Sequence, residues 1–159
     1  MFKDSEYIIH DARTIVIYTC NASDVLPAFN SGFTGYSTFK NVNEDNTYTI
    51  TVVADSLNNL PTSISFDSEI NLLSLDYLNV SNVTSMARMF YGCSNLVSAD
   101  LSNQDCSKVT STLSMFEKCT NIRTIDLTNT NMSLTNFQAM FGACSNLEEI
   151  KYDGWINES

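Results

Sequence analysis

The sequence predicts an α/β solenoid, a stack of short repeats that each contribute one parallel strand and one short helix, with a small β-rich unit in front. A Met-Phe pair with a Cys three residues after the Phe occurs at Met89, Met115 and Met140, so the copies are 26 and 25 residues apart. Every copy is followed by a strand-like apolar segment, and the apolar period differs between the two halves of the repeat. One repeat of this size cannot bury its own apolar face, so the repeats are expected to stack.

The strand half of each repeat follows an asparagine. The four asparagines are Asn71, Asn95, Asn121 and Asn146, where the repeats begin. In the six residues after each of them, positions one, four and six are apolar, which is the L-x-x-L-x-L pattern of leucine-rich repeats. The last two apolar residues are expected to point inward and the residue between them to face solvent. We therefore expect one parallel strand per repeat, over residues 72–77, 96–101, 122–127 and 147–152.

The other half of each repeat changes its period. Met86, Met89, Phe90 and Cys93 stand at i, i+3, i+4 and i+7, which predicts a single apolar stripe on a helix of about two turns. The spacing recurs over residues 137–144, and over 112–119 with Thr112 at the first position, so the middle helix is expected to be the weakest. A threonine precedes each stripe and is expected to cap the helix through its hydroxyl. These residues are Thr84, Thr110 and Thr135.

Residues 1–70 lack the repeat and are expected to form a β-rich domain or cap, with the repeat array in 71–159. β-Branched and aromatic runs predict strands over 14–20 and 47–53. The stretch 29–39 is expected to be a loop whose aromatic side chains either cover the first repeat or form a contact surface. Residues 60–66 are expected to form a strand that pairs with the first repeat strand.

Composition excludes several classes of partner. The chain has 18 acidic and 8 basic residues and a net charge of −10, and it has no basic patch in sequence, which argues against nucleic acid or an anionic membrane as partner. No segment approaches the ~20 apolar residues of a membrane span. The N-terminus lacks the basic start and apolar run of a secretory signal. We therefore expect a location outside the membrane, in a virion or at a cell surface, reached by a route other than a signal peptide written in this chain.

The cysteines are expected to be part of the core. Three of the five, Cys93, Cys119 and Cys144, occupy one position of the repeat, which favours a column of buried thiols over disulfides or metal ligands. There is no C-x-x-C pair, and the sequence has a single histidine, His10, so no zinc site is expected. No cofactor motif is present, and we expect none to be bound.

Two runs carry a resemblance to a known family. Residues 79–96 and 105–110 are similar to the BspA-type leucine-rich repeat of bacterial surface proteins, whose V-T-x-M-x-x-M-F-x-x-C motif is specific to this repeat class. The resemblance covers residues 71–152. It implies a non-enzymatic recognition or adhesion module, found on bacterial surfaces and in proteins of phages that infect such bacteria.

The candidate binding surface is a column of charged residues at the solvent-facing strand position. Asp76, Asp100 and Asp126 are followed in the column by Lys151, and adjacent strands would place them ~5 Å apart. Three aligned carboxylates either invite a hard cation such as calcium or form a wet, hydrogen-bonded face whose charge Lys151 offsets at one end. Trp155 either covers the last repeat, or that end docks another subunit and makes a homo-oligomer.

The expected function is that of a non-enzymatic interaction module on a surface, with a phage virion structural or decoration protein as the first setting. A fragment of a bacterial adhesin that binds host proteins is the alternative. The third candidate, from a different class, is a hydrolase that uses Asp76, Asp100 or His10, although no motif places these residues together. No nucleic acid is expected as partner, and the sequence does not identify the ligand.

Overall fold

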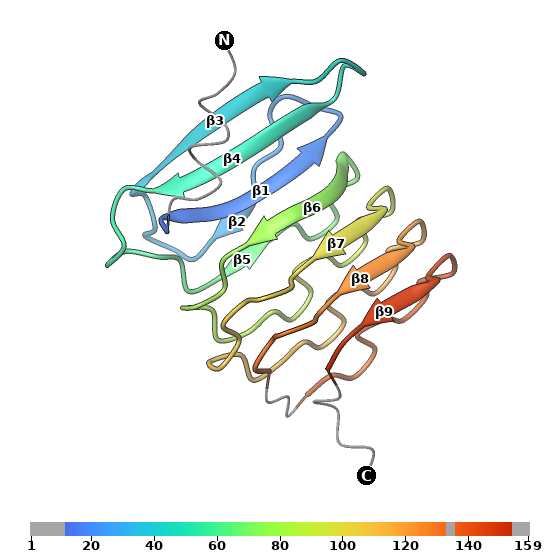
Figure 1. Cartoon of the computed structure of the whole chain (residues 1–159). Coiled ribbons are helices and arrows are strands. Elements are labelled where there is room, and N and C mark those ends of the chain that lie inside the picture. Colours follow the sequence, from blue (N-terminus) through green and yellow to red (C-terminus); the bar gives the residue numbers. More distant parts are fainter. Residues whose placement is uncertain (1–11, 133–135, 154–159) are drawn as a thin grey trace.

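The fold is built from β-strands. The computed structural model describes residues 12–132 and 136–153, and within these residues there are nine strands in two sheets and no helix (Figure 1). None of the described residues belongs to a helix long and apolar enough to cross a membrane. The strands are β1 (Thr14–Cys20), β2 (Ala28–Phe29), β3 (Tyr36–Val42), β4 (Tyr48–Ala54), β5 (Ile64–Ser65), β6 (Leu72–Leu78), β7 (Ser98–Asp100), β8 (Thr124–Asp126) and β9 (Glu149–Lys151).

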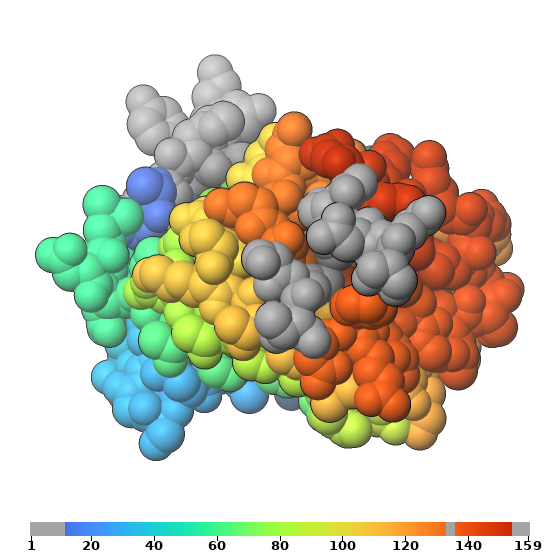
Figure 2. Space-filling model, turned by 90° about the horizontal axis from the view of Figure 1, so that it is seen from below, coloured from blue at the N-terminus to red at the C-terminus, as the bar shows by residue number. Residues whose placement is uncertain are grey.

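One mixed sheet runs through most of the molecule, in the order β3-β4-β1-β6-β7-β8-β9. β6 to β9 are parallel and succeed one another, while β3, β4, β1 and β6 pair antiparallel (Figure 1). β1 therefore joins the N-terminal strands to the repeat strands in one sheet. The successive turns of the chain lie as adjacent bands on the lower face, coloured green through red (Figure 2).

The predicted α/β class is wrong, because the short helices do not form. Residues 86–93 instead make two consecutive turns, closed by Met89 N–H to Met86 O at 3.2 Å and Cys93 N–H to Phe90 O at 3.1 Å. The third residue of each turn has a positive φ, 57° at Arg88 and 69° at Gly92. A left-handed residue at this position is what a type II turn requires and what an α-helix cannot contain. The same positions in the next two repeats also have positive φ: Ser114, Lys118, Ala139 and Ala143.

Backbone N–H groups of these turns bond to the neighbouring repeat. Met86 N–H donates to Ser111 O and Phe90 N–H to Met115 O, both at 2.9 Å, and residues 112–118 bond in the same way to 136–142. Because these groups are used between repeats, they are not available for the i−4 bonds of a helix. Thr84 and Thr110 therefore cap no helix, and Thr135 lies outside the described residues.

The core lies between the sheet and the stacked turns. Its centre is a column of four phenylalanine rings, with successive centroids 5.7, 5.2 and 6.2 Å apart and planes within 12° of parallel. These rings belong to Phe66, Phe90, Phe116 and Phe141. All five cysteines are free thiols, four of them buried and Cys144 half-buried. The thiols thus act as small core residues, as the sequence indicated.

Two predictions for the N-terminal part are wrong. The stretch 29–39, expected to be a loop, contains part of β2 and the first half of β3. The segment 60–66 does not pair with the first repeat strand, because β5 pairs with β2 while β6 pairs with β1. Pairing between strands far apart in sequence leaves no local pattern, so the sequence predicts a strand over residues 14–20 but not its neighbours in the sheet.

Candidate functional site

The predicted charge column lies on adjacent strands. Asp100 pairs with Asp126 across β7 and β8, and Asp126 pairs with Lys151 across β8 and β9. Asp76 follows Leu75, which pairs with Ala99, so it stands beside Asp100 at the other end of the column. The residues that directly precede these aspartates on their strands, such as Leu75 and Ala99, have buried side chains. Trp155, the fifth predicted binding residue, lies outside the described residues.

Asp100 and Asp126 also end their strands. One carboxylate oxygen of Asp100 accepts hydrogen bonds from the backbone N–H of Ser102 at 2.9 Å and from its hydroxyl at 2.6 Å. Asp126 accepts the same pair from Thr128 at 3.0 and 2.7 Å. An Asp whose side chain bonds to the backbone two residues later forms an Asx-turn, which offers the backbone an alternative to regular strand bonding.

Asp76 has a different environment. The residue two positions later is Leu78, so Asp76 accepts instead from the hydroxyl of Ser74 at 3.0 Å and from that of Thr19 on β1 at 3.2 Å. The turn after β6 is made by Asn79, whose side-chain oxygen accepts from the N–H and hydroxyl of Ser81. Asp76 is therefore the aspartate of the column that does not form an Asx-turn.

The pKa shifts follow from these contacts. Desolvation by surrounding groups raises the pKa of Asp76, against the lowering effect of its two hydroxyl donors, and the charge of Asp100 raises it further. Desolvation opposes the shift of Asp126, but the hydrogen bonds from Thr128 and the charge of Lys151, whose Nζ is 4.0 Å away, lower its pKa. The charged form of the carboxylate is thus disfavoured at Asp76 and favoured at Asp126.

Two shallow depressions lie at the column, and both are lined by Asp76 and Asp100. One, of 340 Å³, lies over the strand face between Asp76 and Lys151. The other, of 390 Å³, lies between the strand ends and the loops that follow them. Its polar lining includes Asn79, Ser81, Asn103, Gln104 and Asp105.

The carboxylates do not converge on a common point. In the part of the chain that the structure describes, no group of three or more His, Cys, Asp or Glu side chains is placed to hold a metal ion. Each carboxylate of the column is instead bonded to hydroxyl or amide donors, so the geometry favours the hydrogen-bonded face over the calcium alternative.

The residues considered for hydrolysis are not brought together. His10 lies outside the described residues. Burial raises the pKa of Cys93 and of Cys106 to about 12, so at neutral pH neither is a thiolate nucleophile. The arrangement therefore offers polar contacts to a ligand, and no described pair of nucleophile and base.

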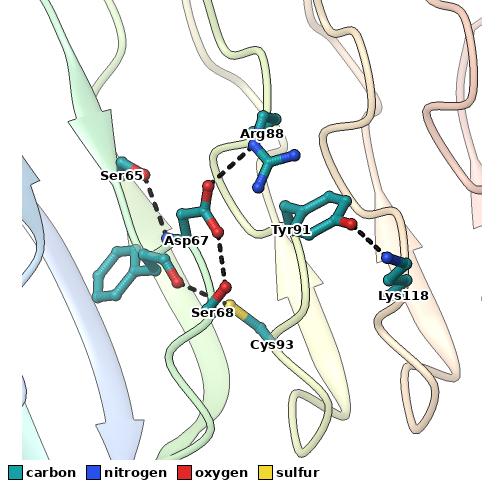
Figure 3. A network of polar contacts seen from close by, with 8 residues as sticks. Ser65, Asp67, Ser68, Arg88, Tyr91, Cys93 and Lys118 are labelled. Atoms are coloured by element: carbon teal, nitrogen blue, oxygen red, sulfur yellow. Dashed lines mark hydrogen bonds and ion pairs between the residues drawn. The ribbon is translucent and has the colours of Figure 1, made fainter.

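A second polar cluster was missed in the sequence. Arg88 donates to Asp67 at 3.0 Å, and its guanidinium carbon lies 3.6 Å from the ring centroid of Tyr91, whose hydroxyl accepts a hydrogen bond from Lys118 (Figure 3). These four residues come from three successive turns of the chain, so the cluster ties the turns together at the surface. Its position depends on the left-handed residues Arg88 and Lys118, for which the sequence has no clear signal.

The loop residues of the second depression carry a local pattern in the sequence. Asp or Asn followed two residues later by Ser or Thr occurs at Asn79, Asp100, Asp105 and Asp126. In all four the first side chain accepts a hydrogen bond from the backbone of the later residue. The tripeptide forms turns of the face, and it also occurs away from the face at Asn21, Asp45 and Asn82, so it indicates a turn and not the site.

A family model described as "Mycoplasma protein of unknown function, DUF285" matches residues 27–155, well over half of the chain. The chain belongs to the DUF285 family. Comparison with curated proteins and with solved structures finds no match. The DUF285 match begins just before β2 and runs through all the repeat strands, so it includes the acidic face and its loops.

Proposed function

We propose that this DUF285 protein is a non-enzymatic interaction module that binds a protein partner on its acidic strand face. The observation that carries the proposal is the column Asp76, Asp100, Asp126 and Lys151, with one depression over it and a second at the ends of its strands. A face of rigid strands next to exposed polar loops is a common arrangement for recognition, because the strands fix positions and the loops supply variety.

The charge of the face selects the chemistry of the partner. Three carboxylates on neighbouring strands, with Asp105 in the adjoining loop, fit a segment that carries Lys or Arg side chains. Lys151 at the end of the column would contact an acidic or polar group of the same segment. The openness of both depressions fits an extended peptide or a protein surface rather than an enclosed small molecule.

The resemblance of residues 71–152 to the BspA-type repeat supports a role in adhesion. The proposal includes display of this module on a surface. The family description names Mycoplasma, which favours a bacterial surface adhesin over a component of a phage particle. Labelling of intact cells with an antibody against the chain, compared with labelling of purified particles, separates the two settings.

The proposed binding face is tested with a displayed library of random extended peptides. We expect selected peptides to be enriched in Lys and Arg and to bind more weakly as salt increases, because exposed ion pairs are screened. A variant with Asp76→Asn, Asp100→Asn and Asp126→Asn should lose about ten-fold in affinity. Asparagine keeps the turn-forming acceptor, as Asn79 already does in this chain, so the fold is retained.

A control variant carries the same change in net charge elsewhere. Asp24→Asn, Glu44→Gln and Asp55→Asn alter exposed residues that line neither depression. We expect it to bind the selected peptides as the unmodified chain does. Equal loss in both triple variants, or a selection without basic residues, contradicts the proposed site.

A further inference from the structure

β3 forms one edge of the seven-stranded sheet, at the end opposite β9 (Figure 1). It pairs with β4 through seven successive residues, from Tyr36 with Ala54 to Val42 with Tyr48, without a register shift. Proteins protect exposed edges with bulges, proline, charge or short length. β3 has no bulge and no proline, and its one charged residue is Lys40. The other edge strand, β9, has three residues and two charges.

The register identifies which backbone groups of β3 face away from the sheet. Asp55 N–H donates to Gly35 O at 2.8 Å, and Asn43 N–H donates to Thr47 O at 2.9 Å, so residues 35 and 43 bond toward β4. Bonding alternates along an antiparallel strand. The odd-numbered residues of β3 therefore bond to β4, and the even-numbered ones direct their N–H and C=O groups outward.

The outward groups form a template for another strand. Tyr36 N–H is used locally, since it donates to Thr34 O at 3.1 Å. Among the described residues, no strand pairs with the outer side of β3. The exposed side chains on this strand include Phe39, 46% exposed, and Val42, 67% exposed. The outward backbone groups without a backbone partner in the described structure belong to Thr38, Lys40 and Val42.

We propose that β3 pairs antiparallel with β3 of a second copy of this chain, across a two-fold axis at Phe39. Full overlap of two antiparallel seven-residue strands places the fourth residue, Phe39, opposite its counterpart. The other pairs are Tyr36 with Val42, Ser37 with Asn41 and Thr38 with Lys40. Outward-facing residues then meet outward-facing residues, as a ladder requires, and Phe39 falls at a non-hydrogen-bonded position, where side chains are closest.

The strand is chemically self-complementary in this register. Aromatic meets aromatic at Phe39, aromatic meets β-branched at Tyr36, and polar meets polar at Ser37. Lys40 is opposite Thr38, so no like charges face one another directly. The ammonium of Lys40 also lies 5.7 Å from the ring centroid of Tyr48 on its own β4, which draws the charge back over its own sheet. These features favour a second copy over an unrelated strand.

The proposed dimer has a consequence for binding. A two-fold axis that relates two antiparallel edge strands stands perpendicular to the sheet, so equivalent faces of both copies lie on the same side. The two acidic strand faces would then point in one direction, at opposite ends of a continuous sheet. A dimer of this kind can bind two sites on one partner surface at the same time, which raises the avidity without new contacts within either binding site. The dimer does not depend on the proposed function, because β3 is remote in the sheet order from β7 to β9.

Sedimentation of the full chain over a range of concentrations tests the pairing. We expect a reversible monomer–dimer equilibrium. For Thr38→Pro we expect the dissociation constant of the dimer to be at least ten-fold higher. Thr38 N–H faces outward, so proline removes a bond to the second copy and none to β4. Phe39→Cys should form a disulfide-linked dimer under mild oxidation, whereas Leu57→Cys, exposed at 55% outside β3, should not.

Substitutions of opposite charge at Phe39, on the proposed two-fold axis, give the most specific test of the dimer. Phe39→Glu and Phe39→Lys should each be monomeric, because like charges meet directly, and an equimolar mixture should form a heterodimer. Circular dichroism spectra that match the unmodified chain exclude misfolding as the cause. A chain that stays monomeric at all accessible concentrations overturns the proposal. A dimer that survives both Thr38→Pro and Phe39→Glu overturns it too, since it must then use another surface.

Discussion

The thiol of Cys119 donates a hydrogen bond of 3.0 Å to the backbone oxygen of Phe90 in the preceding turn of the chain. The same oxygen accepts the backbone N–H of Cys93 at 3.1 Å. Cys93 and Cys144 repeat the thiol contact with the oxygens of Phe66 and Phe116, again at 3.0 Å. The Phe-x-x-Cys spacing is thus explained: the Phe oxygen receives an amide from its own turn and a thiol from the next.

Cys119→Ala should lower the free energy of unfolding by about 1–2 kcal/mol, because it removes a buried hydrogen bond and leaves a small cavity. Cys144→Ala removes the same kind of bond from a half-buried residue in the last described turn, so its loss should be smaller. Urea unfolding of both variants measures the difference. Equal losses would mean that burial does not set the contribution of the thiol.

Thr112→Val should stabilise the fold by about 1 kcal/mol. Thr112 is fully buried at the position that Met86 holds in the previous repeat, and no described residue accepts or donates a hydrogen bond at its hydroxyl. Valine has nearly the same shape and removes the cost of an unsatisfied buried group. Thr130→Val is the matched control, because the buried Thr130 hydroxyl donates to Leu127 O at 2.9 Å, and this variant should be less stable. Thermal unfolding of the two variants should shift in opposite directions.

The strands of the repeats were predictable because their burial pattern is local. Leu75, Ala99 and Ile125 point inward and are buried, as the alternating pattern requires. The column of charges followed from the same alignment, because residues between inward positions must share the outer face. The exact extents were less accurate, since β7, β8 and β9 have three residues each.

The turns were not predictable from apolar spacing alone. Two consecutive four-residue turns place residues 86, 89, 90 and 93 on one side just as a helix does, so the i, i+3, i+4, i+7 pattern does not separate the two structures. Gly92 was the available signal, but Lys118 and Ala143 occupy the equivalent positions in the next repeats and conceal it. The two depressions are lined by the strands and by the loops that follow β6 and β7, so the sequence indicated the charge column without its surroundings.

Ala143→Gly should stabilise the chain by up to about 1 kcal/mol. Ala143 is exposed and has a φ of 56°, where the Cβ of an L-residue is strained and glycine is not. The relief exceeds the entropy that glycine adds to the unfolded state. Ala87→Gly, at an exposed position without positive φ, should instead destabilise by about 0.5–1 kcal/mol. If both variants lost stability, the left-handed turn at Ala143 would be contradicted.

The pH dependence of stability should differ in sign between Asp105 and Asp76. Hydrogen bonds from Ser107 and Asn131 lower the pKa of Asp105 to about 2, below its unfolded value of about 3.9. Its stabilising contribution is therefore present above about pH 4 and is lost as the pH falls toward 2. Asp105→Asn should remove that contribution, so its stability difference from the unmodified chain should shrink as the pH falls through this window.

Asp76 behaves in the opposite way, because desolvation raises its folded pKa above the unfolded value. The folded state then holds the proton more tightly, and stability decreases as the pH rises from the unfolded pKa through the folded one. Asp76→Asn removes this penalty, so its advantage over the unmodified chain should grow with pH across that window. Chemical unfolding at a series of pH values from 2 to 7 compares both variants directly. Parallel curves for Asp76→Asn and Asp105→Asn would contradict the distinct environments of the two carboxylates, one desolvated beside β1 and the other bonded at an exposed turn.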